Sequence, residues 1–388
     1  MQLNSIRAKV LAALAACLLL GVGGLIALMH YSFEQNSHAL ALESVSGAQK
    51  LYSILEAREI SKMAAVGDTL MKNTQVRDAF LAKDRDRLLQ LTAPLYAQIK
   101  EEGITNVVFH TPEPELSVLL RLHAPARFGD SIDRFLTKEA ARTHAMVTGS
   151  ELGKGGFAVR VVQPFPDSHT GIGGYLEFGE ELGQFIHAMK DQTGSDYGLL
   201  LNKKFLDPKL WQESSVTWNR RDNWDDNANF VVADKTTTSD AIIQFDGDLS
   251  SVPPEGTVLE RFKDGDHVFV RGLFPIVDAS GNTVGAMFVV KDISGFYLSM
   301  LRTQTVLVVL TVAGLVAITI FVLTMLSRLV FRRLDHIIQV ATRVVGGDYE
   351  TEIKVSSEDE VGQFERLFEQ FRLVFVDVLS HVPELQEK

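Results

Sequence analysis

The sequence has almost no cysteine for disulfide bonds, and it has no excess of basic charge. It has one cysteine, Cys17, so it can form neither an intramolecular disulfide nor a cysteine-based zinc site. Its 38 basic side chains are outnumbered by 49 acidic ones, which gives a formal net charge of −11. This balance argues against nucleic-acid binding, which needs a clustered basic face. The hydrophobic content of 46% excludes a disordered chain, so packing must supply the stability.

Signatures of catalysis are also missing. The sequence contains no P-loop, no His-Glu-x-x-His pair and no Gly-x-Ser-x-Gly nucleophile turn. The glycine-rich stretch Gly153-Lys154-Gly155-Gly156 lacks the P-loop spacing and predicts a turn. We therefore predict no catalytic residue, no metal site and no cofactor, and we expect that the chain is not an enzyme.

Two stretches without a charged residue, Val10–Met29 and Val306–Leu326, are long enough to cross a membrane. At about 1.5 Å per residue, a helix of about 20 residues spans the roughly 30 Å hydrocarbon layer of a bilayer. The segment Leu14-Ala15-Ala16-Cys17 has the form of a lipoprotein cleavage box. However, the apolar run continues as far as Met29, which favours a retained anchor.

Basic residues flank the two stretches on the sides that face the chain ends. They are Arg7 and Lys9 before the first stretch, and Arg328, Arg332, Arg333 and Arg343 after the second. We predict transmembrane helices over 10–29 and 304–327 from the apolar stretches, and the positive-inside rule predicts their orientation. The N-terminal residues 1–9 and the C-terminus would lie in the cytoplasm, and residues 30–304 would lie outside it.

The region between the two stretches begins with helical patterns and continues with strands. No proline precedes Pro94, and the composition predicts an uninterrupted stalk helix over 30–74. Further helices are expected over 74–82 and 83–102. After Gly103, apolar runs predict strands over 104–109 and 117–122.

The chain also repeats itself at a constant offset. Without a gap, Val159-Arg160, Pro164, Asp167 and Gly174 align with Val270-Arg271, Pro275, Asp278 and Gly285. Both copies predict an apolar strand that a proline ends, a turn with Asp and Gly, and a second apolar strand. We predict two tandem α+β domains over 75–195 and 196–303, each with an antiparallel sheet. Two unrelated hairpins with similar turns are the alternative.

This central region resembles double Cache sensory domains, in particular the double-sensory-domain subtype. The resemblance rests on Phe109-His110-Thr111-Pro112, Leu120 to Pro125, Phe128-Gly129-Asp130 with Arg134, Trp211, Arg221 to Asp225 and Thr236. It implies two PAS-like α+β domains behind a long N-terminal helix, with sensing in the membrane-distal domain. Since this subtype occurs in bacterial chemoreceptors, sensor kinases and cyclases, it also implies a bacterial inner membrane and a periplasmic central region.

Two amphipathic helical patterns follow the second apolar stretch. The first has apolar residues at 334, 338, 341 and 345, and it ends at Gly346-Gly347-Asp348. The second begins at the acidic cluster 358–360 and has apolar residues at 361, 364, 368, 371, 375 and 378. The second set forms a heptad seam that needs a partner helix.

The segment 328–379 resembles a HAMP relay. The resemblance rests on Gly347-Asp348 and Asp359-Glu360-Val361-Gly362, although the first helix lacks the proline that often opens it. It implies a parallel four-helix bundle in a homodimer. A coiled coil that only dimerises the chain is the alternative. The short tail over 380–388 is too small for an output domain.

Basic residues gather where a PAS-like domain opens its pocket, namely Arg121, His123, Arg127, Arg134 and Arg160. Because arginine binds carboxylates through two parallel donors, this set predicts a site for a small organic anion. Structural roles are the alternative. Arg134 would pair with Asp130 and fix a loop, and Arg160, which has the counterpart Arg271, would belong to the scaffold. We expect His110, beside Thr111-Pro112, to be a turn residue.

The leading interpretation is a homodimeric transmembrane sensory receptor. It would detect a small molecule or an extracytoplasmic protein. It would then signal through the HAMP segment to a separate cytoplasmic output protein, in chemotaxis or two-component signalling. One alternative is the truncated sensor portion of a diguanylate cyclase or histidine kinase. Another is a structural or transport accessory.

Overall fold

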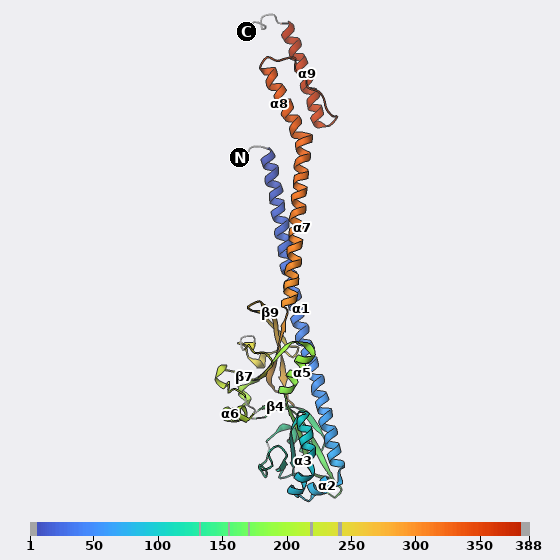
Figure 1. Cartoon of the computed structure of the whole chain (residues 1–388), viewed down its shortest axis with the longest axis vertical. Helices are drawn as coiled ribbons and strands as arrows, with labels where there is room; N and C mark the ends of the chain where they lie inside the picture. Colours follow the sequence, from blue (N-terminus) through green and yellow to red (C-terminus); the bar gives the residue numbers. More distant parts are fainter. Residues whose placement is uncertain are drawn as a thin grey trace. The chain divides into compact units, whose positions relative to one another are not determined.

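A computed structural model describes residues 6–131, 133–153, 156–169, 171–217, 220–239 and 243–381. The chain divides into two compact units, each treated by itself (Figure 1). The sheet unit contains residues 32–299, and the helical unit contains residues 1–31 and 300–388.

The helices are α1 (Ile6–Lys72), α2 (Thr74–Leu81), α3 (Arg85–Glu101), α4 (Phe135–Thr143), α5 (Gly183–Thr193), α6 (Pro208–Thr217), α7 (Ser294–Leu326), α8 (Arg332–Val345) and α9 (Glu360–His381). The strands are β1 (Ile104–His110), β2 (Val118–Arg121), β3 (Val147–Gly153), β4 (Gly156–Asp167), β5 (Gly171–Glu181), β6 (Asp196–Asn202), β7 (Phe230–Lys235), β8 (Thr257–Asp264), β9 (His267–Val277) and β10 (Thr283–Asp292).

The sheet unit contains two five-stranded antiparallel sheets of identical topology. The first sheet has the order β2-β1-β5-β4-β3, and the second has the order β7-β6-β10-β9-β8. The alignment of the sequence repeat places β3, β4 and β5 on β8, β9 and β10, with their ends in close agreement. The sequence repeat is therefore a structural repeat, and the predicted α+β fold class is confirmed.

The two prolines of the repeat do not end their strands, so that prediction is wrong. Pro164 lies inside β4 and Pro275 lies inside β9. β3 pairs with β4 only as far as Val162, and β8 pairs with β9 only as far as Leu273. Each proline therefore has a neighbouring strand on one side only, where a missing N–H is tolerated.

The two glycines of the repeat lie in strands rather than in turns, which is a second correction. A Cβ at Gly174 would clash with the carbonyl oxygen of His110, and a Cβ at Gly285 would clash with that of Leu200. The neighbouring strand thus comes too close for any side chain. In the β3–β4 hairpin, Gly153 pairs with Gly156, whereas positions 154 and 155 lie outside the described residues.

The predicted uninterrupted helix is confirmed as α1, which ends at Lys72. Within the sheet unit it presents a buried apolar stripe whose members follow helical spacing: Ala41, Val45, Ala48, Tyr52 and Leu55. Tyr52 contacts both sheets. Its hydroxyl lies 3.1 Å from Ser150 Oγ in β3, and its ring centroid lies 6.0 Å from that of Phe274 in β9.

The start of α7 is fixed to α1 and to the second sheet. The ring centroid of Phe33 in α1 lies 5.4 Å from that of Tyr297. The guanidinium carbon of Arg261 lies 4.6 Å from the centre of the Phe33 ring. At the end of β10, Ser294 N donates to Asp292 Oδ1 at 2.7 Å. The second sheet therefore holds α1 and α7 together.

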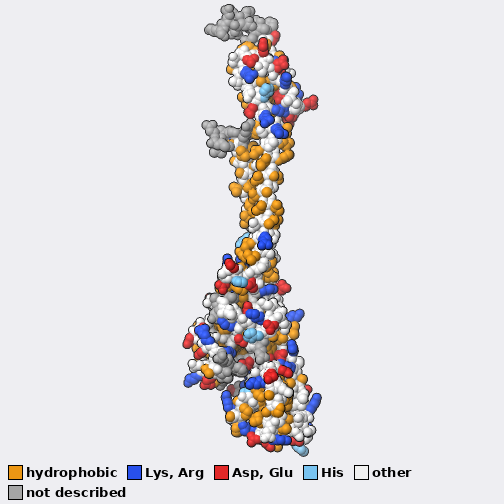
Figure 2. All heavy atoms as spheres, viewed as in Figure 1, with side chains coloured by type: hydrophobic (Ala, Val, Ile, Leu, Met, Phe, Trp, Pro, Cys, Tyr) orange, Lys and Arg blue, Asp and Glu red, His pale blue; other side chains and the backbone are white. Residues whose placement is uncertain are grey.

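The helical unit contains the two apolar stretches. In the described part of the chain, α1 and the helix that begins at Ser294 are long and apolar enough to cross a membrane. Figure 2 shows hydrophobic side chains over both. Leu20 is 77% exposed and Phe321 is 68% exposed. Exposed apolar surface of this extent is typical of a membrane-facing segment.

A π-helical turn over Ser327–Phe331 joins α7 to α8. In α8, Ile337 and Val344 are buried in a small cluster with Ile353 of the α8–α9 connector. Two of the apolar positions predicted for the first helix are exposed in the single chain, Ile338 at 62% and Val345 at 89%. The adjacent face of α8 packs on the connector instead. Of the predicted tail, positions 382–388 lie outside the described residues.

Candidate functional site

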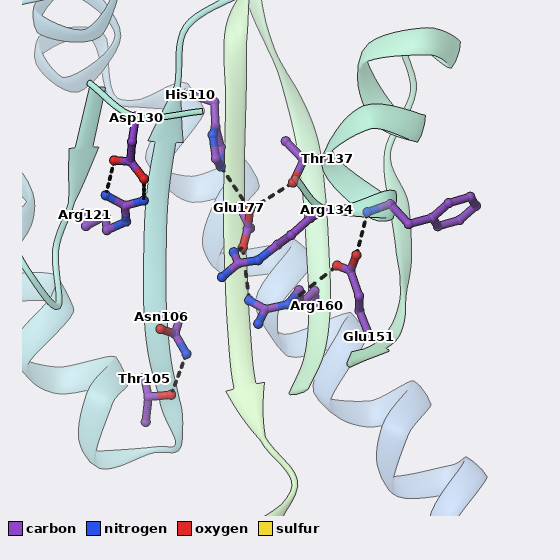
Figure 3. A network of polar contacts seen from close by, with 11 residues as sticks. Thr105, Asn106, His110, Arg121, Asp130, Arg134, Thr137, Glu151, Arg160 and Glu177 are labelled. Carbon is purple, nitrogen blue, oxygen red and sulfur yellow. Dashed lines mark hydrogen bonds and ion pairs between the residues drawn. The ribbon is translucent and has the colours of Figure 1, made fainter. Parts of the chain in front are cut away.

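The two faces of the first sheet differ in polarity. Because side chains alternate along a strand, Val107 and Phe178 point into the main hydrophobic core. His110, Arg160 and Glu177 belong to the opposite face, on which α4 lies (Figure 3). All three are buried, so their charges and polar atoms need partners within the protein.

Glu177 of β5 is the centre of this polar network (Figure 3). Its side chain is fully buried. Oε2 lies 2.9 Å from His110 Nε2 and accepts a hydrogen bond from Thr137 Oγ1 of α4 at 3.1 Å. Oε1 accepts from Arg160 Nη1 at 3.0 Å and also from Arg134 Nη1. One carboxylate thus joins three strands to α4 and to the residue that precedes it.

The network keeps Glu177 ionised. Burial alone would raise the pKa of its carboxyl group. Arg134, the hydrogen bond from His110 and the charge of Arg160 outweigh burial and hold the pKa of Glu177 well below its usual value. In the same network, burial and the charge of Arg134 lower the pKa of Arg160.

A second buried carboxylate, Glu151 of β3, holds the N-terminus of α4. Its Oε1 accepts the backbone N–H of Phe135 at 2.6 Å, and its Oε2 lies 3.7 Å from Arg160 Nε. Burial raises the pKa of Glu151, and Arg160 opposes this effect. Because Arg134 bonds to Glu177 and Phe135 bonds to Glu151, the start of α4 is fixed to the sheet at two adjacent residues.

Arg121 belongs to a separate ion pair. Its two terminal nitrogens each bond to one carboxylate oxygen of Asp130 at 2.7 Å, and Nη1 also donates to the carbonyl of Arg127 at 2.8 Å. The hydrogen bond from Arg121 lowers the pKa of Asp130 to about 2. The expected pairing of Asp130 with Arg134 is therefore wrong, because Arg134 bonds to the buried Glu177 instead.

His123 and Arg127 are exposed, and among the described residues their side chains have no hydrogen-bond partner. Although His123 is exposed as a whole, partial burial of its ring, then the charges of Arg121 and Arg134, lower its pKa to about 4. His123 is therefore neutral at pH 7, so its ring has one N–H donor and one acceptor nitrogen.

The five predicted ligand residues thus fall into three groups. Arg134 and Arg160 meet at Glu177, Arg121 pairs with Asp130, and His123 and Arg127 face solvent. The sequence interpretation missed Glu177, Glu151 and Thr137. An acidic residue inside an otherwise apolar strand, as at Glu177 between Leu176 and Phe178, was the available signal.

The prediction that His110 is a turn residue is wrong, because it is the last residue of β1 and is fully buried. Across the described ranges, no three His, Cys, Asp or Glu side chains come together as a metal site.

Comparison with known proteins identifies the central region. Residues 43–219 match the sequence profile of a family described as the double sensory domain of two-component sensor kinases. This region of the chain belongs to that family. No curated protein matches the sequence significantly.

Several solved structures are similar to the chain at low identity. The periplasmic domain of Vibrio cholerae LuxQ matches with a TM-score of 0.40 and 11% identity, and the match covers 63% of this chain and 98% of that one. The sensor domain of the V. cholerae histidine kinase DctB matches with a TM-score of 0.38 and 12% identity, covering 68% and 98%. The ligand-binding domain of the Pseudomonas fluorescens chemoreceptor CtaA, solved with L-isoleucine, matches with a TM-score of 0.32 and 10% identity, covering 68% and 94%.

The double sensory domain is a sensory module rather than a catalytic one. It lies in the sequence between the two apolar stretches, which belong to long helices. The chain is therefore a membrane protein with a sensory domain outside the membrane.

Proposed function

We propose that the chain is a sensory receptor of the bacterial inner membrane. In this proposal, residues 30–304 lie in the periplasm and both termini lie in the cytoplasm. The membrane-distal domain is 75–195, and the membrane-proximal domain is 196–303. The observation that supports this most strongly is the position of the double sensory domain between two uncharged apolar stretches.

The proposed stimulus is a small organic anion that binds at the polar face of the first sheet. Arg127 and His123 are exposed, and the Arg134 side chain is 25% exposed, so a carboxylate has access to all three. Arg121 and Arg160 do not contact the ligand in this proposal. Arg121 bonds to Asp130 and Arg160 bonds to Glu177, and these ion pairs hold the site in place. A ligand carboxylate that bonded to Arg134 would compete with Glu177 for that guanidinium and would change how α4 is held.

α1 offers a route from this face to the apolar stretches. Tyr52 contacts both sheets, and Phe33 packs on the start of α7. A stimulus needs only about 1.4 kcal/mol of differential affinity between two states to change their ratio tenfold. In this proposal, the two states differ by a small displacement of α1 against the second sheet.

We assign 328–379 the role of a HAMP relay in a homodimer, read by a separate output protein. Exposed apolar side chains in α8 and α9 support this, since Ile338 is 62% exposed, Phe364 49% and Phe371 62%. Burying each large apolar side chain contributes about 1.5–3 kcal/mol. A second copy that covered these side chains would therefore stabilise the dimer substantially.

Cysteine labelling tests the proposed topology, and the sequence makes the experiment clean because Cys17 is the only cysteine. In a Cys17→Ser background, one cysteine replaces the exposed Glu115 or the exposed Glu350. A membrane-impermeant maleimide added to spheroplasts should label Glu115→Cys at once and Glu350→Cys only after permeabilisation. Labelling in the opposite order would place the sensory domain in the cytoplasm and would refute the proposal.

Deleting residues 329–378 tests the division of labour between the sheets and the relay. The shortened chain should bind an organic anion as tightly as the full chain, but it should give no output in cells. Loss of anion binding in the deletion variant would contradict this division.

A further inference from the structure

A cavity of about 380 Å³ lies where the two sheets meet within the sheet unit. Thr105 of β1 and Glu181 of β5 line it from the first sheet, and Leu199 of β6 and Asp234 of β7 line it from the second. His187 of α5 and Arg220 complete the polar lining. This volume is within the range of small-molecule sites. The cavity is distinct from the Glu177 network, and no residue of that network lines it.

The two acids of this cavity, Glu181 and Asp234, are half-buried, and their carboxylates make few contacts within the protein. Among the described residues, no hydrogen bond reaches the carboxylate of Glu181, and the only one that reaches Asp234 is from Lys235 N. Burial is the largest influence on the pKa of each and raises it. The charges of Arg220 and Arg160 oppose the rise at Glu181, and the hydrogen bond from Lys235 N and the charges of His187 and Arg220 oppose it at Asp234. Because neither carboxylate forms an ion pair or a side-chain hydrogen bond among the described residues, both can accept donors from a ligand.

In the described part of the chain, Arg220 forms no hydrogen bond with either carboxylate. Its Nη1 donates to the carbonyl of Ala233 at 3.0 Å, and its Nη2 lies 3.4 Å from Ser214 Oγ. Its guanidinium carbon lies 5.2 Å from the ring centre of Trp211. The guanidinium is thus held by the second sheet and α6 rather than by either carboxylate. The charge of Arg220 lowers the pKa of Glu181 and of Asp234, but its guanidinium leaves both carboxylates open to a ligand.

We propose that this cavity binds a small organic cation with a primary ammonium group, held between Glu181 and Asp234. An ammonium group has three donors, which suits two carboxylates that line one cavity from different sheets. A metal ion fits less well, because the acids and histidines within the described ranges do not converge on one point. The bound cation would join the two sheets. The binding itself does not depend on the sensory role proposed above.

Isothermal titration of the full chain in detergent micelles tests this inference. The probes are putrescine and ethanolamine, and the control is 1,4-butanediol, which matches putrescine in shape but has no charge. We expect at least one amine to bind with a Kd of about 1 mM or tighter, and no binding of the diol. Glu181→Gln should weaken amine binding at least about tenfold, and Asp234→Asn should do the same.

Glu115→Gln, at an exposed acid between β1 and β2 and outside the cavity, should leave amine binding unchanged. Three results would overturn the inference: neither amine binds, the diol binds as tightly as putrescine, or both cavity variants bind the amine as tightly as the unchanged chain. The comparison of putrescine with the diol uses the unchanged protein, so it decides the question even where a variant fails to fold.

Discussion

The two sheets share one topology but fill the same face with opposite kinds of side chain. In the alignment of the repeat, Glu177 of the first sheet corresponds to Phe288 of the second, and Glu151 corresponds to Phe262. Phe288 is fully buried in an apolar cluster, on which Phe262 packs. The fold therefore does not need buried charge on this face.

Arg160 of the first sheet corresponds to Arg271 of the second, but the surroundings of the two arginines differ. Arg160 is 5% exposed and bonds to Glu177. The guanidinium carbon of Arg271 lies 4.9 Å from the ring centre of Phe262, and its Nε donates to the carbonyl of Glu260 at 3.2 Å. Since buried ion pairs add little net stability compared with apolar packing, the network of the first sheet is better explained by a role in positioning α4.

The largest expected effect comes from removing the charge at the centre of the network. Glu177→Gln leaves the buried Arg160 and the partly buried Arg134 without their main counter-charge, which costs about 3–5 kcal/mol. Hydrogen exchange of the full chain should show faster opening of β4 and β5, with β9 and β10 unchanged.

A matched variant separates the cost of broken pairing from the cost of lost charge. Replacing four members of the network by apolar residues, with His110→Leu, Arg134→Leu, Arg160→Met and Glu177→Leu, removes both sides of the ion pairs together and should restore most of the stability. If Glu177→Gln alone costs less than about 1 kcal/mol, the network is not the tightly coupled unit described here.

A smaller effect is expected at the glycines that the two sheets share. Gly174→Ala and Gly285→Ala each place a Cβ against a carbonyl oxygen of the neighbouring strand, which costs about 1–3 kcal/mol. Gly174 should be the more sensitive of the two, because its φ of +143° is also unfavourable for alanine. Denaturant unfolding followed by far-ultraviolet circular dichroism measures both.

Gly295→Ala is the control for this pair, because a Cβ there meets nothing within 4 Å. It should change stability little. A cost at Gly174 with none at Gly285 would show that the two sheets do not share this packing constraint.

The smallest expected effect is a pH dependence to which Glu180 of the first sheet contributes most clearly. Burial raises the pKa of Glu180 to about 7, Lys62 opposes the rise, and Glu59 adds to it. The folded chain then holds a proton that the unfolded chain releases near pH 4.5. Stability should therefore fall as pH rises from about 4.5 to 7 and stay lower above that range.

Glu180→Gln should flatten this slope. Part of the slope should remain, because burial also raises the pKa of Glu151, Glu181 and Asp234. The corresponding residue of the second sheet is Lys291, so Lys291→Gln should leave the slope unchanged. An equal change in both variants would contradict the difference between the sheets.

Local sequence was enough to predict most of the strands and the long helix. The apolar run from Ile104 and the lack of proline before Pro94 identified β1 and α1, because periodicity and breakers act over a few residues. The repeat predicted a duplicated sheet. The roles predicted for its prolines and glycines were wrong. The prolines are tolerated where a neighbouring strand ends, and the glycines are needed where a neighbouring strand comes close, and neither is visible in local sequence.

The polar site was harder to predict, because its pairings are remote in sequence. His110 and Glu177 are 67 residues apart, and Arg134 and Glu177 are 43 apart. The basic half of the cluster was visible as a concentration of arginines around residues 121–134. The acidic half was hidden inside strands. No local pattern indicates that Asp130 pairs with Arg121 rather than with Arg134.

Anion binding tests most directly whether the first sheet is the one that receives the stimulus. Acetate, lactate, succinate and citrate can be titrated into the full chain and into three variants, Arg127→Gln, His123→Ala and the second-sheet control Arg271→Gln. Our account predicts that at least one anion binds, that Arg127→Gln weakens it about tenfold or more, and that Arg271→Gln does not. Binding of none of the four anions, or a loss confined to Arg271→Gln, would contradict it.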